Sequence, residues 1–179
     1  MISKYLFQCI YKKSLQIMML LLFFQFSFNK TKASDYYWVG GTGSWSDYAN
    51  HWATTSGGLI FHIQIPGPLD DVYFDANSFT STGQTVSMDT TFFYLRNMDW
   101  TGAQFLPTFN AGNINIYGSL TLINNLDWNG GSLHFLATTP VTITSAGNTL
   151  NNVLLEGAGG TWLLSDNLAC VILNINAGT

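Results

Sequence analysis

The fold is decided by the stretch Ala111-Gly-Asn-Ile-Asn-Ile-Tyr-Gly-Ser-Leu-Thr-Leu122. Apolar and polar residues alternate in Ile114-Asn-Ile116 and again in Leu120-Thr-Leu122, with Gly118 between the two runs. Successive side chains of a strand lie on opposite faces, so a strand with one buried face alternates apolar and polar residues. An amphipathic helix instead has apolar residues three and four positions apart. The stretch therefore predicts two short strands joined by a turn.

The same alternation recurs on the C-terminal side of this stretch, in Leu133-His-Phe135, Val141-Thr-Ile143 and Leu173-Asn-Ile175. Segments rich in Gly, Asn and Ser separate these runs, for example Asn129-Gly-Gly-Ser132. Such residues tolerate positive φ or form local side-chain turns, so they end strands rather than extend them. Because no window shows helical spacing, the sequence predicts an all-β fold.

Two of these segments echo earlier ones. Asp99-Trp-Thr-Gly102 returns as Asp127-Trp-Asn-Gly130, and Gly118-Ser-Leu-Thr-Leu122 returns as Gly131-Ser-Leu-His-Phe135. Self-similarity at such spacings is typical of solenoids, in which each coil covers the next. Asparagine at recurring turns suits a parallel β-helix, where like side chains stack about 4.8 Å apart. We predict an irregular parallel β-helix (β-solenoid), with a β-sandwich as the alternative.

Residues 1–33 predict a secretory signal peptide. A basic segment is followed by the short apolar run Leu15–Phe28, and Ala33 supplies a small residue for cleavage. The run is shorter than the roughly 20 apolar residues of a membrane-spanning helix, so no membrane insertion is expected after cleavage. The resulting prediction is a secreted protein at the extracellular cell surface.

Removal of residues 1–33 changes the charge of the chain. Arg96 is then the one Lys or Arg, against ten Asp and Glu residues, which gives a formal charge of −9. A single cation cannot neutralise a row of phosphates, so nucleic acid is excluded as a partner. Anionic membrane surfaces are disfavoured for the same reason.

Residues 34–83 differ from the remainder because aromatic and acidic residues concentrate there. Trp38, Trp45 and Trp52 stand at regular spacing around the glycine-rich turn Gly40–Gly43. Large rings around a tight turn indicate an aromatic cap at the N-terminal end of the solenoid, which would occupy residues 84–179. The other interpretation makes these three tryptophans a carbohydrate-binding platform, because exposed rings stack on sugars. The strand-like run at the C-terminus has no cap after it, which predicts that the chain is truncated there.

The same region carries a resemblance to known proteins. Trp38-Val-Gly-Gly-Thr-Gly-Ser-Trp45-Ser-Asp-Tyr-Ala-Asn-His-Trp52 is followed by Asp71-Val-Tyr-Phe-Asp75. This block resembles the N-terminal region of large, secreted, repetitive adhesin-like surface proteins of Gram-negative bacteria, many of them type IX secreted or autotransporter-like. The resemblance implies a β-solenoid and surface display, with surface glycans or other surface proteins as partners. It brings no catalytic residues.

Two sets of acidic residues suggest a metal site and a catalytic site. Asp70, Asp71 and Asp75 form the densest cluster, and carboxylates are the ligands that Ca²⁺ prefers, so they predict a candidate Ca²⁺ site against the alternative of a hydrogen-bonded turn. No other cofactor is expected. Asp99 and Asp127 would stack on neighbouring coils if one coil were as long as the separation between them, and paired carboxylates can cleave glycans.

Several functions remain open from the sequence. The favoured one is a structural, adhesin-like surface protein that is not an enzyme. A carbohydrate-binding module using the tryptophans is the first alternative. A polysaccharide-cleaving enzyme using the Asp99 and Asp127 pair is the second.

Overall fold

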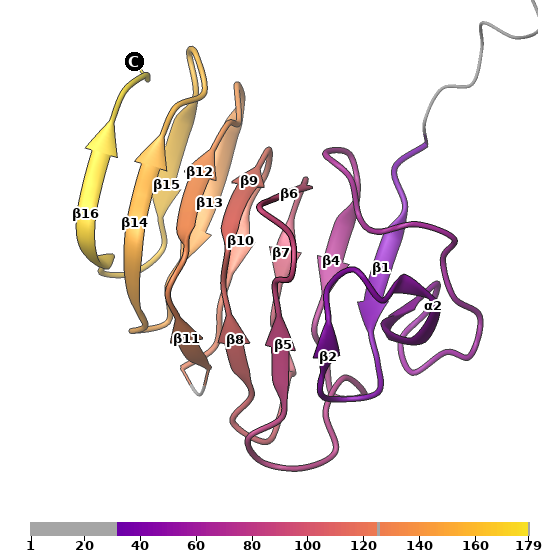
Figure 1. The fold of residues 1–179 in the computed structure, drawn as a ribbon. Coiled ribbons are helices and arrows are strands. Elements are labelled where there is room, and N and C mark those ends of the chain that lie inside the picture. The colour runs from indigo at the N-terminus through magenta and orange to yellow at the C-terminus, as the bar shows by residue number, and fades with distance from the viewer. Residues whose placement is uncertain (1–31, 125, 179) are drawn as a thin grey trace, which may run out of the picture. The chain divides into compact units, whose positions relative to one another are not determined.

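The computed structural model describes residues 32–124 and 126–178, in which nearly all regular structure is β-strand (Figure 1). One short helix, α2, spans Tyr48–His51 within these residues. In this part of the chain no helix has the length and apolar character required to cross a membrane. The predicted all-β class is confirmed. The predicted signal peptide falls almost entirely outside the described residues.

The strands form three sheets, here named A, B and C. Sheet A has seven strands in the order β15-β13-β10-β7-β4-β1-β3. Their bounds in chain order are β1 Asp35–Trp38, β3 Trp52–Ala53, β4 Asp71–Tyr73, β7 Met98–Asp99, β10 Leu120–Thr121, β13 Pro140–Thr144 and β15 Thr161–Leu164.

Sheets B and C complete the coils. Sheet B has the order β11-β8-β5-β2, and sheet C the order β16-β14-β12-β9-β6. The strands of sheet B are β2 Gly43–Ser44, β5 Thr85–Ser87, β8 Thr108–Asn110 and β11 Asp127–Asn129. Those of sheet C are β6 Phe92–Leu95, β9 Asn113–Ile116, β12 Ser132–Phe135, β14 Thr149–Leu155 and β16 Ala169–Ile175.

The chain visits the three sheets in turn, which makes the fold a β-solenoid. Strands β4, β5 and β6 form one coil, then β7, β8 and β9, then β10, β11 and β12. The last two coils use sheets A and C only, through β13 with β14 and β15 with β16. Strands of successive coils pair in parallel, as in β6 with β9 and β9 with β12. The predicted β-helix is confirmed, and this parallel pairing excludes the β-sandwich.

The coil length differs from the one expected from the sequence repeats. In sheet C, Ile114, Leu133, Val153 and Leu173 occupy equivalent positions on successive strands. The stretch of chain from one of these residues to the next is therefore the length of one coil. The repeated segments of the sequence do not superpose on one another. Leu120 lies in sheet A, whereas its expected equivalent, Leu133, lies in sheet C. The segments resemble each other because any strand that follows a turn in this fold needs similar residues.

Side chains that point inward from the strands form one continuous core. In sheet C, Phe93, Ile114, Leu133 and Val153 form a buried column along the axis of the solenoid. Burying an apolar side chain of this size contributes about 1.5–3 kcal/mol. Outside the core, Asn129 donates a 2.9 Å hydrogen bond to Asn110 on the preceding coil, which is the asparagine stacking expected of a β-helix.

Aromatic residues close the N-terminal end. The rings of Trp38 and Trp52 meet edge to face at 4.9 Å between centroids, and those of Trp45 and Trp52 do so at 4.7 Å. Strand β3 pairs antiparallel with β1 and occupies its outer edge. Gly43 is required here because a Cβ at this position would lie 2.0 Å from Nε2 of His51. The close approach of chain and imidazole packs His51 flat against Trp38 at 4.5 Å.

Candidate functional site

The tryptophans predicted as a carbohydrate platform are core residues. Trp38, Trp45 and Trp52 are each 0% exposed. The indole N–H of Trp38 donates to the carbonyl of Gly41 at 2.7 Å, and that of Trp52 donates to the carbonyl of Trp45 at 2.9 Å. Rings buried on all sides cannot stack on a sugar, so the assignment of these residues to carbohydrate binding is wrong. Their role is to form the cap.

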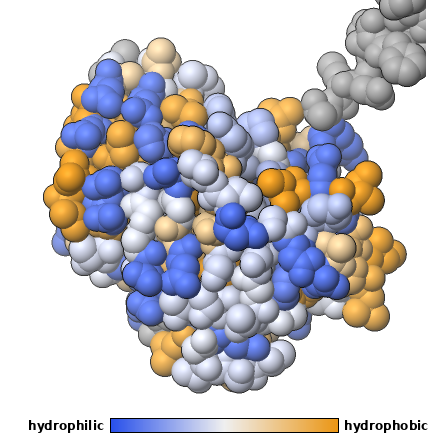
Figure 2. Space-filling view, in the orientation of Figure 1, coloured by the Kyte–Doolittle hydropathy of each residue, from blue (hydrophilic) through white to orange (hydrophobic). Residues whose placement is uncertain are grey.

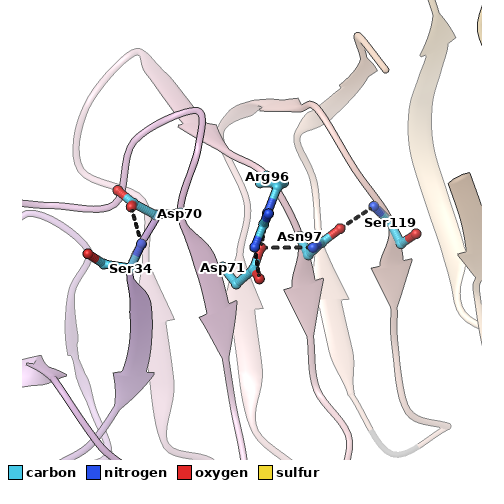
Figure 3. A network of polar contacts seen from close by, with 6 residues as sticks. All are labelled: Ser34, Asp70, Asp71, Arg96, Asn97 and Ser119. Atoms are coloured by element: carbon cyan, nitrogen blue, oxygen red, sulfur yellow. Dashed lines mark hydrogen bonds and ion pairs between the residues drawn. The ribbon is translucent and has the colours of Figure 1, made fainter. Parts of the chain in front are cut away.

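Asp70 holds the turn that leads into β4. Its carboxylate accepts a hydrogen bond from the backbone N–H of Ser34 at 2.9 Å (Figure 3). It accepts another from the backbone N–H of Gly67 at 2.8 Å. A carboxylate that accepts backbone N–H groups in this way stabilises a turn and fixes the direction of the chain that enters the strand. Asp70 therefore joins the beginning of β1 to the turn before β4.

Asp71 belongs to a polar ladder that crosses three coils (Figure 3). Its carboxylate accepts from both Nε and Nη2 of Arg96, with Nε at 2.7 Å, and from Nδ2 of Asn97 at 2.8 Å. The amide oxygen of Asn97 accepts in turn from the backbone N–H of Ser119 at 2.7 Å. Hydrogen bonding to Asp71 raises the pKa of the Arg96 guanidinium. The ladder links Asp71, the first residue of β4, to Asn97 and Ser119, which lie directly before β7 and β10 in sheet A.

Asp75 caps a third, separate turn. Its carboxylate accepts from the backbone N–H of Asn77 at 2.8 Å, while its own N–H donates to the hydroxyl of Ser78 at 2.8 Å. Asp70, Asp71 and Asp75 thus bind different protein donors rather than converging on one point. Within residues 32–124 and 126–178, no three or more His, Cys, Asp or Glu side chains are grouped so that they could hold a metal ion.

The proposed catalytic pair is not assembled. Asp99 lies in β7 of sheet A, beside Thr121, and accepts from the backbone N–H of Thr101 at 2.8 Å. Asp127 lies in β11 of sheet B, beside Thr108, whose hydroxyl donates to it at 3.2 Å. The prediction that these carboxylates stack on neighbouring coils is wrong, because one coil is shorter than the stretch of chain from Asp99 to Asp127. The two aspartates therefore belong to different faces of the solenoid.

Two tyrosines stack on the outer face of sheet A. Tyr37 of β1 and Tyr73 of β4 are neighbours in register, and their rings lie 4.9 Å apart at 16°. Burial, together with the nearby charges of Asp71 and Asp35, raises the pKa of Tyr73 to about 12. Burial and the charge of Asp35 also raise the pKa of Tyr37, so both phenols remain protonated at neutral pH. Each ring of the stacked pair covers one face of the other.

A different set of aromatic residues is exposed on and beside the outer face of sheet C. Phe92 is 54% exposed and Tyr94 is 44% exposed, both on β6, while Tyr117, directly after β9, is 39% exposed. Phe93 and Leu95, the alternate residues of β6, are buried. These residues were not among those predicted from the sequence. The alternation in Phe92-Phe-Tyr-Leu95 was the signal that could have identified two aromatic side chains on the outside of a strand.

Polar side chains continue this face along the solenoid. Register places Asn113, Ser132 and Asn152 in one row with Phe92, and Asn115 and His134 in the adjacent row with Tyr94. We name the set the aromatic–amide face; its members are Phe92, Tyr94, Asn113, Asn115, Tyr117, Ser132, His134 and Asn152.

Hydrogen bonds hold several of these polar groups in place. Asn115 donates to the carbonyl of Phe93 at 3.1 Å, and Asn152 donates to the hydroxyl of Ser132 at 3.1 Å. Nδ1 of His134 lies 2.8 Å from the carboxylate of Glu156. Side chains fixed by such contacts lose little conformational entropy when they bind a partner.

No family model, curated protein or solved structure matches this chain.

Proposed function

We propose that this chain is a non-catalytic structural and adhesive module displayed outside the cell. The observation that carries the proposal is the aromatic–amide face, which has three exposed rings and half-buried polar side chains on and beside the regular strands of sheet C. Rigid strands position surface side chains more accurately than mobile loops do, which suits a surface that binds. The sequence resemblance to secreted adhesin-like proteins and the signal-peptide pattern support the same function.

The acidic residues also support a structural role. Asp70 and Asp71 accept from donors of neighbouring segments, and Asp75 accepts from the backbone N–H of Asn77 within its own turn. A carboxylate committed to such donors stabilises the solenoid. The formal charge of −9 after residue 33 further favours a partner without strong negative charge.

Export is tested by producing the full chain in a Gram-negative host and sequencing the N-terminus of the product. We expect cleavage close to Ala33 and, once the outer membrane is opened, accessibility to external protease, which together report that the chain has crossed the inner membrane. The matched control replaces Leu20 and Leu21 with Arg, which should leave the chain uncleaved in the cytoplasm, since charges abolish the apolar run. An uncleaved wild-type chain in the cytoplasm would contradict the proposal.

Adhesion is tested with beads that carry the purified chain. The beads are washed over immobilised envelope polysaccharide and, separately, over immobilised envelope protein. We expect at least one surface to retain these beads more strongly than albumin-coated beads. Retention on neither surface would remove the adhesive role, whichever compartment the chain reaches.

A further inference from the structure

We infer that the aromatic–amide face binds a neutral polysaccharide whose chain runs along the solenoid axis, across the strands of sheet C. The inference rests on the proposed adhesive function and names the partner class. Its first basis is the exposure of three aromatic rings, those of Phe92 and Tyr94 on β6 and that of Tyr117 directly after β9. Exposed rings offer the apolar contact that the C–H faces of sugars require.

The second basis is the polar chemistry of the same rows. Asn113 and Asn115 continue the rows of Phe92 and Tyr94 on the next strand, followed by Ser132 and His134. An amide both donates and accepts hydrogen bonds, and a hydroxyl does the same, which matches the hydroxyl groups of a sugar. The Nδ2 group of Asn115 is bound to the Phe93 carbonyl, so this side chain is oriented before any ligand arrives.

The third basis is spacing. Neighbouring strands of a sheet lie about 4.8 Å apart, and the register of β6, β9, β12 and β14 repeats this step along the solenoid. One sugar unit of an extended polysaccharide advances by a similar distance. A chain laid along the axis would therefore meet an equivalent position on each coil, beginning with one ring, Phe92 or Tyr94, and continuing over the polar side chains of the same row.

Charge selects a neutral chain over an anionic one. Arg96 is the one Lys or Arg after residue 33, and its guanidinium is bound to Asp71. Glu156 lies beside His134 at the edge of the face and would repel carboxylates or sulfates. Hydrophobic and hydrophilic residues are interspersed over the side of the molecule on which β14 and β16 lie (Figure 2).

The experiment measures depletion of the purified chain by microcrystalline cellulose, by chitin and by immobilised polygalacturonate. We expect binding to at least one of the two neutral polymers and none to the polyanion. The triple variant F92A/Y94A/Y117A should lose at least about tenfold in affinity, since rings central to an interface dominate its binding energy. The matched control is Y48A/F105A, which removes one exposed Tyr and one exposed Phe from other segments and should bind within about twofold of wild type.

Circular dichroism of each variant checks that the fold is retained. The variant N113A/N115A is a second test, which leaves the rings in place and should also weaken binding. The inference is overturned if neither neutral polymer depletes the wild-type chain, or if the triple variant binds as wild type does. Beads retained on envelope protein while both polysaccharides fail would preserve the adhesive function and reject the glycan. Preferential binding to polygalacturonate would reject the charge argument.

Discussion

The two ends of the solenoid differ in how far their inward-facing side chains are buried. At the N-terminal end, Trp38, Trp45 and Trp52 are fully enclosed, and β3 pairs with the outer edge of β1. At the other end, β16 has β14 as its single neighbour in sheet C among the described residues. Inward-facing Leu173 and Ile175 of β16 are exposed there.

The comparison teaches that alternation makes a strand but does not bury it. Leu173-Asn-Ile175 has the same pattern as Ile114-Asn-Ile116, yet the two isoleucines of β9 are buried and the apolar residues of β16 are not. Burial in a solenoid depends on the presence of coils on both sides. Stability should therefore fall from the capped end toward β16.

The largest effect is expected for removal of a cap ring. Trp52→Ala should lower the free energy of unfolding by about 3–5 kcal/mol, because it deletes a ring that contacts Trp38, Trp45 and Tyr36. Urea unfolding followed by circular dichroism measures the change. The control is Trp162→Ala on β15, a partly buried ring, which should cost less than half as much. Equal losses at the two positions would show that the two ends are equally well packed.

A matched pair of leucines in one column of sheet C gives the next effect. Leu133 is 1% exposed and Leu173 is 46% exposed, although both point inward at equivalent positions two coils apart. Leu133→Ala should cost about 2–5 kcal/mol in unfolding free energy, because it leaves a cavity. Leu173→Ala should cost less than about 1 kcal/mol, since its side chain is already half in water. A loss at Leu173 as large as that at Leu133 would mean that β16 is covered in solution.

The smallest effect is expected when the pH is lowered, at Asp166 between β15 and β16. Asp166 accepts from the backbone N–H groups of Ser145 and Ala146, which holds its pKa below the ordinary value of 3.8. A depressed folded-state pKa means that the contribution is present above the unfolded-state pKa of about 4 and is lost as the pH falls through the folded value. Hydrogen exchange of the Ser145 and Ala146 amides, corrected for intrinsic rates, should therefore show less protection at pH 3 than at pH 6.

In Asp166→Asn the same amides should have low protection at both pH values, because a neutral amide is a weaker acceptor than a carboxylate. Distant amides of β9 serve as the internal control and should respond alike in the variant and wild type. If the variant kept the pH dependence of the Ser145 and Ala146 amides, another group would be responsible for it.

Much of the fold could be predicted because it follows from local chemistry. Alternation of apolar and polar residues in segments such as Ile114-Asn-Ile116 predicts strands, and the Gly- and Asn-rich segments predict where the strands end. The site was harder to predict. Phe92 and Tyr94 could be read as outward-facing only once Phe93 and Leu95 were assigned to the core. Trp38, Trp45 and Trp52 were ambiguous, because a large ring has the same sequence pattern in a core as on a binding surface.

By itself the sequence determined strand-forming alternation, the positions of turns, the aromatic block at residues 38–52 and a negative charge after residue 33. Only the tertiary structure decided the coil length, and with it which residues are neighbours. Asp99 and Asp127 were separated onto two faces because the length of each turn between strands sets which side chains align. That length depends on how the whole coil packs against the coils before and after it, and no local pattern contains this information.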